Sequence, residues 1–112
     1  KALTPTTIAQ NACYFDNDPS QVPRRAITMG VGTILECERC LVLVTGSRKA
    51  EILAKAVEGP ATAMVTATAT QFHAHCSVIV DEEATVNLKE REYYRWLYDN
   101  EPEWAVFREG QA

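Results

Sequence analysis

Residues 41–59, LVLVTGSRKAEILAKAVEG, predict a strand, a turn and a helix in succession. Residues 41–45 are all apolar or β-branched, which is typical of a strand buried on both faces. Gly46 interrupts this run, and Ser47 is expected to cap the helix that follows. Apolar residues then recur at helical spacing until the Gly-Pro pair at 59–60 ends the helix.

The turn between this strand and this helix is a candidate anion site. Unpaired N–H groups at a helix N-terminus, together with the helix dipole, favour negative charge. Lys49 adds a full positive charge in the first helical turn. Gly46, Ser47 and Lys49 therefore predict a phosphate-binding turn. A plain strand–helix connection needs the same glycine and serine, so the residues alone leave both interpretations open.

The composition is that of an ordinary single domain, and it argues against two classes of partner. The 112 residues are 46% hydrophobic and 23% charged, with a net charge of −4. This acidic balance, without any basic stripe, argues against nucleic acid as a partner. No apolar run approaches the length of a membrane span or a signal peptide, so no membrane partner is expected.

The start of the sequence indicates a piece of a longer protein. The chain opens at Lys1, without a methionine and without a leader. We therefore expect a fragment, a processed product or an excised part. Four cysteines without a secretory signal predict reduced thiols and a cytoplasmic location.

The cysteines do not form a complete metal motif. Cys37 and Cys40 have CxxC spacing, but a zinc ribbon needs a second such pair or two histidines a helical turn apart. His73 and His75 have the wrong spacing for that role. We expect Cys37 and Cys40 to be small core residues and predict no metal site. A small metal or redox protein that uses these two thiols is one hypothesis, which we rank below the two given at the end of this section.

No cofactor is predicted either. Gly30-Val31-Gly32 has the spacing of the first two glycines of a dinucleotide fingerprint. The third glycine is absent, and so is the acidic residue about twenty positions further on. Close backbone packing explains the two glycines without a nicotinamide site.

The other segments complete an α/β pattern with short links. This alternation predicts a three-layer Rossmann-like half-domain, with a mostly parallel sheet of three or four strands flanked by helices. Residues 1–99 are expected to form this domain portion, and residues 100–112 a C-terminal tail in which Trp104 and Phe107 dock. The expected helices are one through Ile8 that starts at Pro5, a brief one at 33–37 and one that starts at Thr85; the expected strands are 26–29, 76–80 and, as a strand or a tightly packed turn, 61–70.

Several of these motifs occur together, in this order and at nearly these spacings, in one known family. The chain resembles the C-terminal part of glucosamine-6-phosphate deaminase, over Lys1 to about Leu97. The family enzyme is more than twice as long. The matching segments are Phe15–Asp18, Val22–Pro23, Ala26–Thr33, Thr45–Ala50, Ala56–Gly59 and Asp81–Glu82.

The resemblance implies a reaction and a role for one residue. The family opens the ring of glucosamine 6-phosphate, moves a proton from C2 to C1 and releases ammonia to give fructose 6-phosphate. Its general base and ring-opening residues lie in the N-terminal half, so no catalytic residue is expected in this chain. Lys49, in the Gly-Ser-x-Lys turn, matches the lysine that contacts substrate phosphate. The implied partners are a phosphorylated amino sugar, and either the missing N-terminal half or a second copy of the chain.

Three positions depart from the family pattern. Cys13 stands where the family has a second phosphate-binding arginine, and a thiol does not replace a bidentate guanidinium. Val65 replaces a tryptophan. Lys1 matches a lysine of an allosteric phosphosugar site found in some bacterial members, whereas Arg95 stands where that site has a tyrosine. Two hypotheses follow: a deaminase portion that is active only with its N-terminal half, or a non-catalytic module that binds phosphosugars or mediates oligomerisation.

Overall fold

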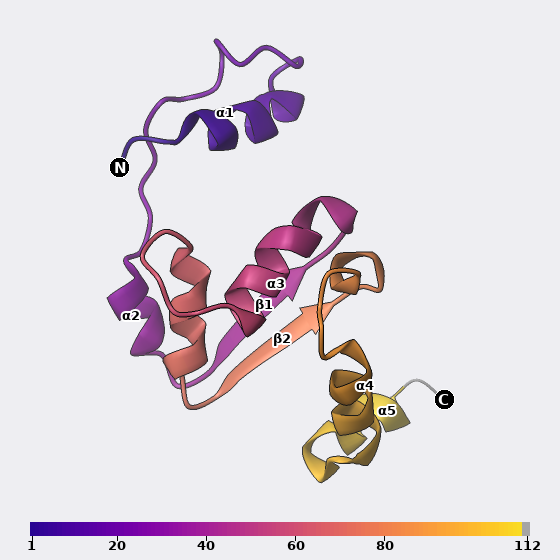
Figure 1. Cartoon of the computed structure of the whole chain (residues 1–112). Coiled ribbons are helices and arrows are strands. Elements are labelled where there is room, and N and C mark those ends of the chain that lie inside the picture. The colour runs from indigo at the N-terminus through magenta and orange to yellow at the C-terminus, as the bar shows by residue number, and fades with distance from the viewer. Residues whose placement is uncertain (111–112) are drawn as a thin grey trace. The chain divides into compact units, whose positions relative to one another are not determined.

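The computed structural model describes residues 1–110 and consists of two compact units. The units are Lys1–Gly30 and Val31–Ala112, and each is described here by itself (Figure 1). Among the residues described, no helix is both long enough and apolar enough to cross a membrane.

The first unit is built around the short helix α1, Pro5–Asn11. Pro5 occupies the first helical position, and the Thr4 side chain accepts the Thr7 N–H at the helix start, as the sequence predicts. The 3₁₀ turn η1, Ala12–Tyr14, continues the helix. The core of this unit consists of Ile8, Ala12 and Val22, with Leu3 and Phe15 packed against them.

The strand expected at residues 26–29 does not form. A single antiparallel bridge joins Ala2 to Arg25, and the Lys1 amino nitrogen donates to the Ala26 carbonyl oxygen at 2.6 Å. Ile27 is 104% exposed. The β-branched residues at 27 and 28 favour an extended backbone, but no strand of this unit lies beside residues 26–29 to pair with them.

The second unit contains a parallel strand pair joined through a helix. β1, Cys40–Val44, pairs in parallel with β2, Cys76–Val80, over all five positions of each strand. Between them lie the 3₁₀ turn η2, Ser47–Lys49, and helix α3, Ala50–Glu58 (Figure 1). Ala50 and Leu53 of α3 are each 2% exposed. The strand, turn and helix predicted for residues 41–59 are therefore confirmed.

The sheet has fewer strands and less cover than the sequence predicts. Three or four strands were expected, whereas the described residues form a two-stranded sheet. Burial along β1 alternates: Leu41 and Leu43 are 59% and 67% exposed, and the other three residues of the strand are half-buried. The expectation that β1 is buried on both faces is wrong for the described chain, because nothing in it covers the Leu41–Leu43 face.

The start of α3 also differs from the prediction. Ser47 was expected to cap the helix, but it lies inside η2, and the N-cap position of α3 is Lys49. No side chain donates or accepts a capping hydrogen bond there. The 3₁₀ turn itself supplies the first hydrogen bonds, from the Lys49 N–H to the Gly46 carbonyl and from the Ala50 N–H to the Ser47 carbonyl.

The segment 61–70 is a packed turn and not a strand. Residues Thr66–Phe72 form the 3₁₀ helix η3, and Thr68 within it is 1% exposed. The Thr68 hydroxyl accepts the Thr62 N–H at 2.8 Å, and its single hydrogen can be donated to the carbonyl oxygen of Val65 at 2.7 Å or of Thr62 at 3.1 Å. The Thr68 side chain thus reaches three backbone groups of this small-residue segment. The brief helix expected at 33–37 is α2, Val31–Leu35.

The C-terminal helices begin later and extend further than expected. The predicted helix from Thr85 is instead the 3₁₀ turn η4, Glu83–Thr85, followed by α4, Arg91–Asn100. The segment predicted as a tail forms the 3₁₀ turn η5, Pro102–Trp104, and helix α5, Ala105–Glu109. The Trp104 ring packs at 6.3 Å from Tyr98 and 5.8 Å from Phe107, centroid to centroid.

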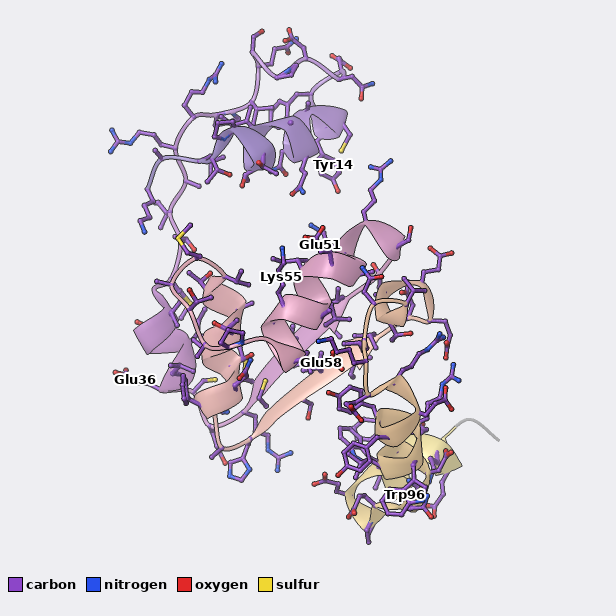
Figure 2. The ribbon with its side chains drawn as sticks, viewed as in Figure 1. Tyr14, Glu36, Glu51, Lys55, Glu58 and Trp96 are labelled. Carbon is purple, nitrogen blue, oxygen red and sulfur yellow. The ribbon has the colours of Figure 1, made fainter. Side chains whose placement is uncertain are left out.

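Glu58 explains why α4 starts at Arg91. Its carboxylate, at the end of α3, accepts the N–H groups of Lys89 and Glu90 at 2.9 Å and the Tyr94 hydroxyl at 3.3 Å. It therefore satisfies the N–H groups of the two residues immediately before α4 from a different helix; Glu58 is labelled in Figure 2. Burial alone would raise the pKa of Glu58, but the hydrogen bonds from Glu90, Lys89 and Tyr94 outweigh it and lower the pKa.

Candidate functional site

The predicted phosphate-binding turn lies where β1 ends. Gly46 has φ +82° and ψ 149°, a left-handed conformation that favours glycine. A Cβ atom at Gly46 would meet no other atom within 4 Å, so the backbone conformation and not the available space requires glycine here. Ser47, Arg48 and Lys49 follow in η2, and all three are exposed.

A carboxylate from the neighbouring strand holds this turn. Asp81, directly after β2, accepts the Gly46 N–H on Oδ2 at 2.8 Å and the Ala84 N–H on Oδ1 at 2.8 Å. One side chain therefore connects the end of β1 to the first turn after β2. The sequence predicts only that the acidic residues 81–83 favour a helix N-terminus; the contact with Gly46, 35 residues away, was missed because only strand pairing creates it.

Internal hydrogen bonds reduce the number of N–H groups that the turn offers to an anion. Those of Gly46, Lys49 and Ala50 already have acceptors within the chain. The N–H groups of Ser47 and Arg48 lie at the start of η2, where no intrahelical acceptor exists. A phosphate at this turn would thus meet these two N–H groups and the side chains of Arg48 and Lys49. Neither of those side chains forms an ion pair within the described residues.

The remaining predicted residues lie in the first unit. Cys13 is exposed, and its thiol donates to the Gln10 carbonyl oxygen at 3.3 Å. Lys1 is exposed as well, with its amino nitrogen on the Ala26 carbonyl. The phosphate-site role of the Cys13 position and the allosteric role of Lys1 therefore stay predictions from the resemblance.

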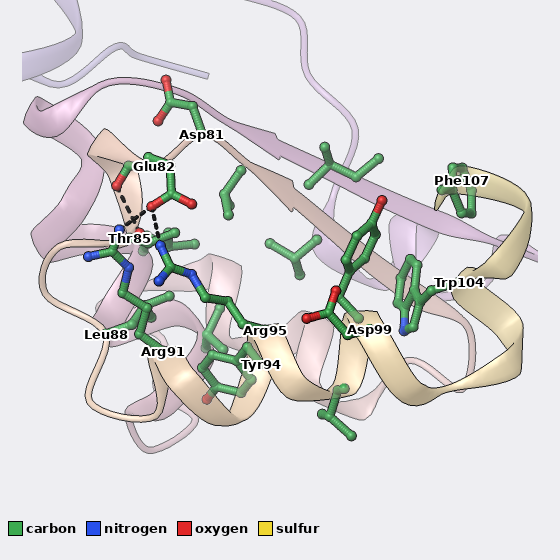
Figure 3. Close-up of a pocket in the computed structure, with 17 residues that line it drawn as sticks. Asp81, Glu82, Thr85, Leu88, Arg91, Tyr94, Arg95, Asp99, Trp104 and Phe107 are labelled. Atoms are coloured by element: carbon green, nitrogen blue, oxygen red, sulfur yellow. Dashed lines mark hydrogen bonds and ion pairs between the residues drawn. The ribbon is translucent and has the colours of Figure 1, made fainter. Parts of the chain in front are cut away.

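A groove lies beside β2, in addition to the turn described above. It has a volume of about 850 Å³ and is open to solvent. Glu82 lies at one end, where it accepts hydrogen bonds from Arg91 and, at 2.6 Å, from Arg95 (Figure 3). These hydrogen bonds lower the pKa of Glu82. The groove is lined mainly by apolar side chains, among them Leu53, Val57, Val78, Ile79, Trp104 and Phe107.

The cysteines differ from the expectation of core residues. Cys37 is exposed, and Cys40 is half-buried at the start of β1. No group of three or more histidine, cysteine or acidic side chains within residues 1–110 is arranged to hold a metal ion.

The parallel strand pair and its connecting helix define an α/β protein of the class in which ligands bind beyond the carboxyl ends of parallel strands. No family model matches the chain. It is 46% identical over 104 residues to glucosamine-6-phosphate deaminase of Streptomyces coelicolor, and this match covers 93% of the chain and 40% of that protein. The deaminases of Bifidobacterium longum and Corynebacterium urealyticum are 43% and 46% identical, and 38% and 41% of their lengths are covered.

Comparison with solved structures finds the same kind of relative. A solved structure described as a monomeric glucosamine-6-phosphate deaminase and missing link of the NagB superfamily superposes with a TM-score of 0.74 at 37% identity. It covers 78% of this chain, which in turn covers 36% of that one. The chain therefore resembles part of the glucosamine-6-phosphate deaminases, as the sequence predicts, and spans about two fifths of the length of the relatives it matches.

Proposed function

We propose that this chain supplies the substrate-phosphate-binding turn of a glucosamine-6-phosphate deaminase, with Gly46, Ser47 and Lys49 as the binding residues. The observation that carries the proposal is the position of the turn. It lies at the carboxyl end of a parallel strand, where α/β proteins bind ligands, with the exposed Lys49 side chain beside it. The matched relatives are named for an activity on a phosphorylated amino sugar.

The chemistry of the whole enzyme requires more than this chain. Ring opening, the C2-to-C1 proton transfer and loss of ammonia need a base and acids, which the family resemblance places in the N-terminal half. The chain therefore binds the substrate phosphate, and the reaction from glucosamine 6-phosphate to fructose 6-phosphate takes place only when that half is supplied. The exposed Leu41–Leu43 face supports a covering partner, either the N-terminal half or a second copy. The four free thiols support a cytoplasmic location.

Cys13 favours a second candidate function. If the family arginine is needed for tight phosphate binding, a chain with a thiol there is a weak binder, and a non-catalytic phosphosugar-binding or oligomerisation module is the alternative. The Cys13→Arg variant separates the two candidates. An increase in phosphate affinity would place position 13 at the phosphate site, and an unchanged affinity would favour the non-catalytic module.

Phosphate titration followed by amide NMR shifts tests the turn directly. We expect shifts centred on residues 46–50 and a Kd on the order of millimolar, about 4 kcal/mol of binding free energy, because two N–H groups and exposed cations act without the family arginine. Lys49→Ala should remove the shifts. Lys55→Ala is the matched control, because this lysine lies on α3 in a surface ion pair with Glu51 at 2.6 Å (Figure 2).

Two outcomes would contradict the proposal. Shifts elsewhere in the chain, with residues 46–50 unaffected, would show that the turn is only a strand–helix connection. Equal losses in Lys49→Ala and Lys55→Ala would show general charge attraction and not a site.

A further inference from the structure

Three thiols lie at the amino ends of the two strands, at the opposite end from the phosphate-binding turn. Cys40 is the first residue of β1 and Cys76 the first residue of β2. The two are direct register partners in the parallel pair. Cys37 precedes Cys40 by three residues.

The strand register brings Cys40 and Cys76 within disulfide range. Register partners in a sheet have their side chains on the same face, and neighbouring strands lie about 4.8 Å apart. Disulfides join Cα atoms about 4.4–6.8 Å apart. The two thiols also interact: burial raises the pKa of Cys76, and the Cys40 thiol raises it further through a hydrogen bond and through charge. Both thiols are half-buried and so partly accessible to a small oxidant.

Cys37 is held by other contacts. Its thiol donates to the Arg39 carbonyl oxygen at 3.0 Å and lies 3.5 Å from His73 Nε2. The His75 N–H donates to His73 Nδ1 at 3.0 Å, which leaves the imidazole proton on Nε2. That Nε2–H donates to the Cys37 carbonyl oxygen at 2.7 Å. These bonds tie Cys37 and its loop to Arg39 and His73, whereas the register pairs Cys40 with Cys76.

We propose that Cys40 and Cys76 form a reversible disulfide between β1 and β2 when hydrogen peroxide oxidises the chain. The Cys40 thiolate attacks peroxide; an S–O bond forms, the O–O bond breaks, and the released hydroxide takes up a proton to become water. The Cys76 sulfur then attacks the resulting sulfenic acid; the S–S bond forms, the S–O bond breaks and a second water leaves. Two thiols are oxidised and one peroxide is reduced to two waters.

The disulfide would link the strands at the end opposite to an existing contact. The other ends of β1 and β2 are joined by the hydrogen bond from Gly46 to Asp81. A covalent link at Cys40 and Cys76 closes a long chain loop and so restricts the unfolded state. We expect oxidation to raise the thermal midpoint by on the order of 10 °C, and a thiol reductant to reverse the change.

Tryptic mapping of the full chain identifies the linked pair without ambiguity. Trypsin cleaves after lysine and arginine, so each of the four cysteines falls in a different peptide: residues 2–24, 26–39, 40–48 and 56–89. The protein is treated with hydrogen peroxide, its remaining thiols are alkylated, and the digest is analysed by mass spectrometry. We expect peptide 40–48 linked to peptide 56–89, lighter than the sum of the two by about 2 Da, because two hydrogens are lost.

Single variants provide the controls. Cys37→Ser and Cys13→Ser should keep the link and the rise in thermal midpoint, whereas Cys40→Ser and Cys76→Ser should lose both. A link between peptides 26–39 and 40–48 would overturn the proposal, and so would oxidation without any linked peptide. The mapping on the unmodified chain decides the question even if a variant fails to fold.

Discussion

The carboxylate of Asp81, directly after β2, accepts the main-chain N–H of Gly46, two residues after the end of β1, at 2.8 Å. This hydrogen bond fixes the backbone of the predicted phosphate-binding turn from the neighbouring strand. It also places a carboxylate beside the turn, where it opposes anion binding. Asp81 therefore has two effects of opposite sign, on the stability of the turn and on its affinity for phosphate.

Asp81→Asn should separate these two effects. One amide oxygen replaces two carboxylate oxygens, so one of the bonds to Gly46 and Ala84 is lost, and we expect a fall in unfolding free energy of about 1–2 kcal/mol by denaturant titration. Phosphate affinity, measured by NMR titration, should rise because the negative charge is gone. Glu83→Gln, an exposed acid in the same segment, is the control and should change stability little. A fall in phosphate affinity for Asp81→Asn would show that Asp81 supports the anion site.

The chain alone should not deaminate glucosamine 6-phosphate. The family resemblance places the general base and the ring-opening residues in segments that this chain does not contain. We expect no ammonia release above background in a coupled assay with freshly purified protein. Turnover by a preparation shown to be free of full-length enzyme would contradict this and would require a base among the residues present.

Glu58 should make stability depend on pH in the acidic range. Its pKa is lowered in the folded state by the N–H groups of Glu90 and Lys89 and by the Tyr94 hydroxyl, which outweigh burial. A lowered folded-state pKa gives stability that is complete above the unfolded value, about 4.3, and is lost as the pH falls through the folded value. Denaturation curves from pH 7 to 3 should show this loss in the wild-type chain.

Glu58→Gln should remove that part of the pH dependence and cost about 1–2 kcal/mol at neutral pH, because the charge-assisted bonds to the start of α4 are lost. Glu51→Gln is the matched control on the same helix (Figure 2). Its ion pair with Lys55 is exposed and screened by solvent. If both variants follow the same stability curve as the wild type, the cap from Glu58 does not hold α4 in solution.

The chain should self-associate when its N-terminal half is not supplied. Leu41 and Leu43 expose an apolar sheet face. Light scattering at micromolar concentration should give a dimer or larger species, and Leu43→Lys should shift it toward the monomer, because a charge on that face opposes its burial. Met64→Lys, at an exposed loop position, is the control. A monomeric wild-type chain with a cooperative melt would contradict the prediction; the related solved deaminase is itself described as monomeric.

The local elements were predictable because neighbouring residues decide them. The apolar run of β1, the break at Gly46 and the helical spacing of α3 each depend on residues close in sequence. The same holds for α1, where Thr4 and Pro5 set the start. The residues Phe15–Asp18 and Thr45–Ala50 carried the family resemblance for the same reason, since a motif is a local pattern.

Tertiary structure decided everything that depends on distant partners. The start of α4 depends on Glu58, more than thirty residues earlier, and the turn geometry depends on Asp81. Residues 26–29 have strand-forming composition but no strand beside them among the described residues 1–30, and within residues 61–70 the Thr68 hydroxyl hydrogen-bonds to the backbone of Thr62 and Val65. By itself the sequence determined the strand–turn–helix unit and the resemblance to glucosamine-6-phosphate deaminases. The pairing of β1 with β2 and the packing of the helices decided which hydrogen-bonding groups are satisfied, and by which distant residues. Hydrogen bonds and burial require atoms that the chain brings together only on folding.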